Sequence, residues 1–246
     1  MGVTVNGPKI IFTIPIFGGI HITESIVNMW IIMAVIVALC IWLTRGLKVV
    51  PTSKKQLVAE KLVDMLYSLV RNTMGERNMR FAPYVGTLFT MSIVGSLSSL
   101  FTLRPYTADF SVVLSWALVT FVLVHGTNIY CNGIKGWAKG FIEPVPFLLP
   151  LNIISEVASP VSMSFRHFGN IAAGTIITKL VYAGLAAASI AILSWIPNAF
   201  FANIPILQLG IPAVLSIYFD LFSSFLQAYI ICMLTMVFIS NTNGNT

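Results

Sequence analysis

The segment P-V-S-M-S-F-R-H-F-G-N-I-A-A-G, residues 160–174, places an arginine inside a long run of apolar and small residues. Arg166 is a permanent cation, because a guanidinium keeps its proton inside proteins. A charged residue at the centre of a lone membrane-spanning helix costs about 2.5–3.5 kcal/mol on insertion scales. Such residues persist where they face a partner, a helix bundle or water, so this segment predicts a polar site within an apolar helix.

The composition of the whole chain indicates a lipid solvent. Of its 246 residues, 57% are hydrophobic and only 9% are charged, whereas a soluble domain carries about 25% charged residues. This much apolar surface cannot be hidden from water in one core, so the chain is an integral membrane protein. The net charge of +6 comes from basic residues in loops beside apolar spans. That pattern reports membrane orientation and not a nucleic acid partner.

The apolar runs predict an all-α membrane protein with five membrane helices and one amphipathic surface helix. The surface helix covers about 52–73, where apolar and basic residues lie on opposite faces. Ser53 and Gln56 have capping-box spacing at its start. The basic stretch 131–140 is expected as a loop. The five spans are expected at about 24–44, 82–103, 110–130, 151–193 and 206–240.

The last two apolar segments, 151–193 and 206–240, exceed the roughly 20 residues that a perpendicular helix needs. No proline interrupts 161–196, so we expect a long, strongly tilted hairpin and not broken helices. Basic residues gather in the first and third loops, which the positive-inside rule assigns to the cytoplasm. The N-terminus is then external and the C-terminus cytoplasmic. Residues 1–246 are expected to form a single membrane domain without a removable signal peptide.

Polar residues at membrane depth form one stripe on each long helix. Steps of three or four residues bring side chains to one helical face. On the first helix this spacing groups Ser159, Ser162, Arg166, Asn170 and Ala173. On the second helix it groups Asp220, Ser223 or Ser224, and Gln227. Small residues allow another helix to pass closely. The purely structural alternatives are a salt bridge between Arg166 and Asp220 and ordinary interhelical hydrogen bonds.

The predicted topology sorts the acidic residues by depth. Glu156 precedes Arg166 on an outward-running helix, so it lies on the cytoplasmic side. Asp220 precedes Gln227 on an inward-running helix and lies nearer the outside, as does Asp109 in its turn. The sequence therefore predicts two polar half-paths that approach the arginine from opposite faces of the membrane.

Three motifs resemble those of subunit a of the rotary ATP synthase. Residues 160–174 are similar to the family pattern P-x-S-L-x-x-R-L-F-G-N-x-x-A-G. The segment R-P-Y-T-A-D-F at 104–110 is similar to P-x-T-A-D-L-N. The segment L-Q-A-Y-I-I-C-M-L-T-M-V-F-I-S at 226–240 is similar to L-Q-A-F-I-F-x-x-L-T-x-x-Y-I-S. Their order and spacing cover nearly the whole chain, so the resemblance is to the bacterial F-type family.

The resemblance implies a role for each matching residue. Arg166 matches the essential arginine that faces the rotating c-ring, with Asn170 one turn on and Gln227 beside it on the second helix. Asp220 and Asp109 match acids of the external half-channel. The candidate set is completed by the cytoplasmic exit acid Glu156 and by the polar neighbours Ser162, Thr175 and Ser223.

Some positions depart from the family pattern or have no assigned role. Thr175 stands where some members carry an acid, so Asp220 is expected to carry more of the entry route. His167 stands where leucine is usual, and packing is favoured over a proton relay. His125 is expected to be packed or hydrogen-bonded, and Lys179 to extend outward.

The resemblance implies an ion-translocating stator subunit that couples ion flow to rotation and ATP synthesis. The same resemblance implies that it lies in the plasma membrane of a bacterium, one copy per complex, with the c-ring, peripheral stalk subunit b and the lipid bilayer as its partners. The chain contains no G-x-x-x-x-G-K-[ST] loop, so it hydrolyses no ATP itself. No cofactor or metal is expected. Protons are favoured over sodium as the coupling ion, which the ring selects. The alternative function is an independent secondary transporter or ion channel with an intramembrane arginine.

Overall fold

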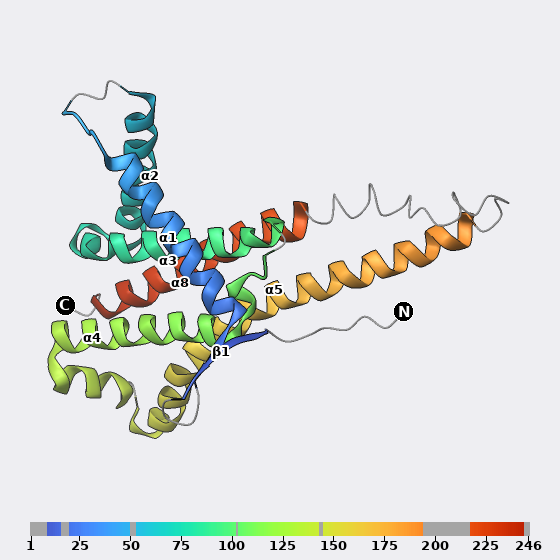
Figure 1. Ribbon diagram of the computed structural model, residues 1–246. Helices are drawn as coiled ribbons and strands as arrows, with labels where there is room; N and C mark the ends of the chain where they lie inside the picture. Colours follow the sequence, from blue (N-terminus) through green and yellow to red (C-terminus); the bar gives the residue numbers. More distant parts are fainter. Residues whose placement is uncertain are drawn as a thin grey trace.

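The computed structural model describes residues 9–15, 20–49, 53–101, 103–142, 145–193 and 217–243. Within these ranges the fold is helical (Figure 1). The helices are α1 Glu24–Thr44, α2 Lys54–Met74, α3 Ala82–Leu97, α4 Phe110–Ile142, α5 Leu149–Leu193 and α8 Ser223–Asn243. Short 3₁₀ turns lie between them, at η1 Glu76–Phe81, η2 Ser98–Phe101, η3 Tyr106–Ala108 and η4 Pro146–Leu148. Five helices among the described residues are long and apolar enough to cross a membrane, which confirms the predicted fold class.

A short β-hairpin precedes the first helix. Strand β1 (Ile10–Ile14) pairs antiparallel with β2 (Ile20–Thr23), and the Glu24 N–H donates to the Lys9 carbonyl. The sequence analysis predicted no element here. The helical fold therefore carries an additional hairpin immediately before α1.

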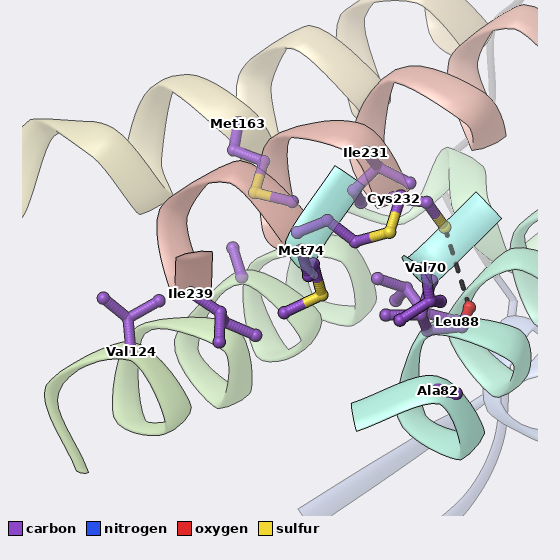
Figure 2. Close-up of a cluster of buried hydrophobic side chains, with 12 residues drawn as sticks. Val70, Met74, Ala82, Leu88, Val124, Met163, Ile231, Cys232 and Ile239 are labelled. Carbon is purple, nitrogen blue, oxygen red and sulfur yellow. Dashed lines mark hydrogen bonds between the residues drawn. The ribbon is translucent and has the colours of Figure 1, made fainter. Parts of the chain in front are cut away.

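Helix α8 lies at the centre of the bundle and contacts α2, α3, α4 and α5. Buried apolar side chains from all five helices meet there (Figure 2). They include Val70 and Met74 of α2, Ala82 and Leu88 of α3, Val124 of α4, Met163 of α5, and Ile231, Cys232 and Ile239 of α8. The Cys232 thiol donates to the Val85 carbonyl at 3.8 Å. The sequence motif of residues 226–240 thus supplies much of the core.

Helix α2 matches the predicted amphipathic helix but divides its apolar face between two environments. Leu62 and its neighbours in the first half are exposed, whereas Val70 near the end is fully buried against α8. Ser53 caps the helix as predicted, because its hydroxyl accepts the Gln56 N–H at 3.2 Å. The Gln56 amide completes no reciprocal box. It instead donates to the Lys48 carbonyl at 2.6 Å and accepts the Lys48 N–H at 3.2 Å, which ties α2 to the segment that follows α1.

The prediction that residues 131–140 form a loop is wrong. Helix α4 continues to Ile142 across a kink at Gly133, where φ is 70° and ψ is 171°. Only glycine adopts this backbone region without strain. The chain therefore bends at Gly133 and resumes the helix, so the basic stretch forms a second helical limb that folds back.

Helix α5 is continuous over 45 residues, with Pro160 inside it, and so spans about 68 Å at 1.5 Å per residue. The prediction that this segment is not split in two is confirmed. Few of the α5 residues whose side chains are described are buried within the subunit, so most of its described surface is left uncovered. The second arm of the predicted hairpin is described from the π-helical turn η6 (Ile217–Phe222) onward. Its predicted start at 206 lies outside the described residues.

Candidate functional site

Arg166 is exposed on the uncovered surface of α5. Burial of the neighbouring residues follows the turn of the helix. Ser164 and His167 are fully buried in the subunit, whereas Phe165 is 57% exposed. Among the residues whose side chains are described, the carboxylate ion pairs join Glu76 to Arg71 and Glu156 to His125, and none involves Arg166. Among these described side chains, Arg166 therefore has no carboxylate partner. Asp220 lies in η6, but its side chain is outside the described residues, so a salt bridge to it is untested.

One turn after Arg166, helices α5 and α8 are joined by polar side chains. The Asn170 Nδ2 donates to the Ser223 hydroxyl at 2.9 Å and to the Gln227 Oε1 at 3.4 Å. Gln227 is only 3% exposed. A buried amide requires hydrogen-bond partners, since its desolvation is otherwise uncompensated. Three residues predicted from two separate stripes therefore meet, and they hold α8 beside the arginine.

The turn that carries the R-P-Y-T-A-D-F motif is a packing centre. Tyr106 is fully buried, and its hydroxyl donates to the Met91 carbonyl at 2.6 Å. Burial raises the pKa of this hydroxyl, so it remains a donor at neutral pH. The turn is also tied to α1, because the Asn28 amide donates to the Arg104 carbonyl at 3.1 Å. The turn thereby connects α1, α3 and α4.

Asp109 follows this turn and caps α4. Its Oδ1 accepts the Ser111 N–H at 3.2 Å, as expected of a carboxylate at a helix N-terminus. The next residue, Phe110, packs its ring against Phe165 and Phe168 of α5, with centroids 4.8 and 5.7 Å apart. The start of α4 is therefore held beside the residues that flank Arg166.

A cavity of about 760 Å³ lies between the end of α4, the start of α5 and the end of α8. Polar groups from all three helices line it, among them Asn128, Asn132, Glu156, Ser159 and Asn241. The lining reaches Met163, about one turn before Arg166. Glu156 thus borders a cavity whose lining extends to about one turn from the arginine.

His125 of α4 lies beside Glu156, with Nε2 and Oε1 3.4 Å apart. Its other ring nitrogen, Nδ1, accepts a hydrogen bond from the Trp137 indole N–H at 3.0 Å. The prediction that His125 is packed or hydrogen-bonded is confirmed, but its proximity to Glu156 was missed. No spacing signal could have found it, because the contact joins two helices across the fold.

The remaining candidates are placed as follows. Ser162 is exposed on α5, one turn before Arg166. Thr175 belongs to α5, but its side chain is outside the described residues. His167 is fully buried, with its ring 6.1 Å from that of Trp116, which confirms the packing prediction. Within the described ranges, no three His, Cys, Asp or Glu side chains are grouped as metal ligands.

Comparison with known protein families identifies the family of this chain. Residues 26–240 match the family model of the ATP synthase A chain. The chain belongs to this family. Subunit a is a non-catalytic, multi-pass membrane subunit of the bacterial ATP synthase complex, and it translocates ions. This membership favours the stator subunit over the alternative of an independent transporter.

Individual members of the subunit a family match over nearly their full length. The sodium-ion-specific subunit a of Propionigenium modestum is 29% identical over 98% of this chain and 86% of its own length. Subunit a of Moorella thermoacetica is 31% identical over 91% of this chain and 92% of its own. Subunit a 1 of Hahella chejuensis is 32% identical over 93% of this chain and 88% of its own length.

Proposed function

We propose that this subunit a loads and unloads the carboxylates of a c-ring through two offset half-channels separated by Arg166. The observation that carries the proposal is the exposed guanidinium on the uncovered surface of α5. The Asn170 hydrogen bonds to α8 support it, because they fix the helix one turn away. The c-ring passes along this surface of α5, and peripheral stalk subunit b and lipid contact the remaining exterior.

The fixed charge of Arg166 drives the release of the ion. A neutral, ion-loaded ring carboxylate that arrives opposite the guanidinium gains attraction only when it ionises. At about 4 Å and an effective dielectric constant of about 20, this attraction is about 4 kcal/mol, which favours release. The same cation repels a hydrated proton, so it prevents direct leakage between the half-channels. A lysine is a poorer substitute, because an amine can lose its proton when desolvated.

The cavity between α4, α5 and α8 forms the cytoplasmic half-channel, with Glu156 as its acid. The ends of α4 and α8 and the start of α5 share this side, in keeping with a cytoplasmic C-terminus and an external N-terminus. Asp109 and Asp220 belong to the external half-channel. The position of Phe110 against Phe165 supports this assignment for Asp109, since it brings the start of α4 next to the arginine.

The test compares the two exposed cations of α5 in the assembled complex, assayed in inverted membrane vesicles. Arg166→Ala is expected to leave assembly and ATP hydrolysis by the soluble sector intact and to abolish ATP-driven ion pumping. Lys179→Ala, the matched control, is expected to pump normally, because Lys179 lies about three and a half turns along the helix. Coupled pumping by Arg166→Ala would refute the role of the arginine.

The half-channel assignment and the coupling ion have tests of their own. Asp220→Asn is expected to slow ion entry more than Glu156→Gln does, and wild-type rates in both variants would contradict the assignment. We propose that the coupling ion is the proton. Dye quenching that reports proton pumping is then expected in sodium-free buffer, and a sodium requirement would contradict this choice.

A further inference from the structure

The indole of Trp137 contacts His125 because α4 folds back on itself. These residues are 12 positions apart in the chain, and their side chains meet at 3.0 Å. In a straight helix the same separation is about 18 Å. The bend at Gly133, with its φ of 70°, lies between them. The second limb of α4 therefore brings a hydrogen-bond donor to a histidine of the first limb.

This contact selects one tautomer of His125. An indole nitrogen only donates hydrogen bonds, so the Nδ1 atom that receives it must be unprotonated. The neutral ring then carries its proton on Nε2, the atom 3.4 Å from the Glu156 Oε1. Nε2 is buried and makes no aligned hydrogen bond with a described residue. Glu156 borders the cavity and its side chain is 42% exposed, so rotation of its carboxyl group can complete that bond.

We propose that Trp137 and His125 are positioning residues for Glu156, holding its carboxylate at the cavity wall as the proton acceptor of the cytoplasmic half-channel. This inference rests on the proposed function. Glu156 receives a proton released near Arg166, becomes a neutral carboxylic acid, and passes the proton to solvent in the cavity. His125 keeps its Nε2 proton throughout and donates a hydrogen bond to the carboxylate, which is strengthened by the negative charge.

The surroundings of His125 hold its ring in the orientation that this contact requires. A second proton on Nδ1 would face the Trp137 N–H, and two donors cannot share a hydrogen bond. The ring also packs against Phe121, with centroids 4.0 Å apart. The Phe141 ring is more distant, with its centroid 6.5 Å from that of His125. The titratable groups that face this region are Glu156 from α5, and Lys139 and Cys131 from α4, which line the same cavity. Helix α8 contributes only uncharged side chains to the described lining, namely Phe238, Asn241 and Thr242.

The test uses substitutions that separate hydrogen bonding from packing. His125→Phe keeps an aromatic ring but removes the hydrogen bond from Trp137 and the proposed one to Glu156. It is expected to lower the pumping rate about tenfold, the loss of one charge-assisted bond. His125→Gln is expected to recover most of that loss, since an amide oxygen can accept from Trp137 while its NH₂ donates to Glu156. Phe141→Leu removes a neighbouring ring but neither bond, so it is expected to pump at the wild-type rate.

The dependence of pumping on medium pH in Trp137→Phe tests the role of the indole donor most sharply. Without the indole donor, Nδ1 is free to take a proton as the cytoplasmic pH falls, and the imidazolium would hold Glu156 ionised. Inverted vesicles expose the cytoplasmic face to the medium, so pumping can be measured against medium pH. Trp137→Phe is expected to lose pumping activity in acidic medium relative to the wild type, because an imidazole can take a second proton within the physiological pH range. Trp137→Phe combined with His125→Gln is expected to lack this acid limb, because an amide does not titrate there.

Measuring Arg166→Ala in the same vesicles separates a failure of the positioning role of His125 from a failure of the proposed half-channel function. Equal rates for His125→Phe and His125→Gln, or a wild-type pH profile for Trp137→Phe, would overturn the positioning role. If Arg166→Ala still abolishes pumping in that case, the half-channel proposal stands and only the role of His125 fails. Coupled pumping by Arg166→Ala would instead remove the function on which this inference rests.

Discussion

Gly95→Ala is expected to destabilise the turn that precedes α4. A Cβ atom built at Gly95 would lie 2.3 Å from the Tyr106 Cζ and 2.5 Å from its hydroxyl oxygen. Carbon atoms pack at about 3.5–4.0 Å, so the ring would have to withdraw by about 1 Å or more. Tyr106 is fully buried, which leaves it no free space to occupy. The expected result is displacement of the ring together with its turn.

The size of the effect follows from three contributions. Overpacking of a buried site costs about 1–3 kcal/mol. Loss of the Tyr106 hydrogen bond to the Met91 carbonyl adds about 1 kcal/mol. The gain in helix propensity from glycine to alanine offsets about 1 kcal/mol. The net destabilisation is therefore about 1–3 kcal/mol, enough to lower the temperature at which the complex loses subunit a in detergent.

The matched control is Gly126→Ala on α4, where an added Cβ meets no atom within 4 Å. This variant is expected to be as stable as the wild type or slightly more stable. Stability is measured by heating the purified complex and following retention of subunit a and ATP-driven pumping. Equal retention in Gly95→Ala and Gly126→Ala would refute the close packing of Tyr106. Rescue of Gly95→Ala by Tyr106→Leu would support it, since the smaller side chain relieves the clash.

Two further predictions concern residues near Arg166. Asn170→Leu removes the partner of buried Gln227, so it is expected to weaken the α5–α8 contact by about 1–2 kcal/mol. A thermal-retention assay of the complex checks this, and Asn170→Leu/Gln227→Leu should recover part of the loss; an additive result would contradict direct pairing. Asp109→Asn keeps a cap for α4 but loses its charge. It is expected to match wild-type stability while slowing ion entry, whereas normal entry would limit Asp109 to its capping role.

The sequence predicted the elements whose signals are local. The apolar run of residues 151–193 closely matches α5 at Leu149–Leu193, because hydrophobic length is a property of the segment itself. The Ser53 cap was predicted for the same reason, since it depends on the next three residues only. The three- and four-residue spacing likewise identified Asn170 and Gln227, which the structure joins directly.

The missed features depend on backbone conformation or on tertiary contact. The β-hairpin has a local signal, namely β-branched residues in Ile10–Ile14 and Ile20–Thr23 around a Gly-Gly pair, but it lies outside the long apolar runs that predict the membrane helices. Gly133 was treated as part of a loop, because its positive φ is invisible in the letters. The contact between His125 and Glu156 follows from how α4 packs on α5, so no spacing rule reveals it.

Two serines on α5 allow the most direct test of whether the surface around Arg166 faces a rotor. Ser162 is exposed, whereas Ser164 is fully buried and donates to the Pro160 carbonyl at 2.7 Å. Each serine is replaced by cysteine, and a second cysteine is introduced beside the ring carboxylate. Oxidation of the assembled complex then tests whether the two cysteines form a disulfide. Ser162→Cys is expected to form a disulfide with the ring and Ser164→Cys is not. Cross-linking through Ser164→Cys but not through Ser162→Cys would mean that Arg166 faces away from the ring, contrary to the proposed mechanism.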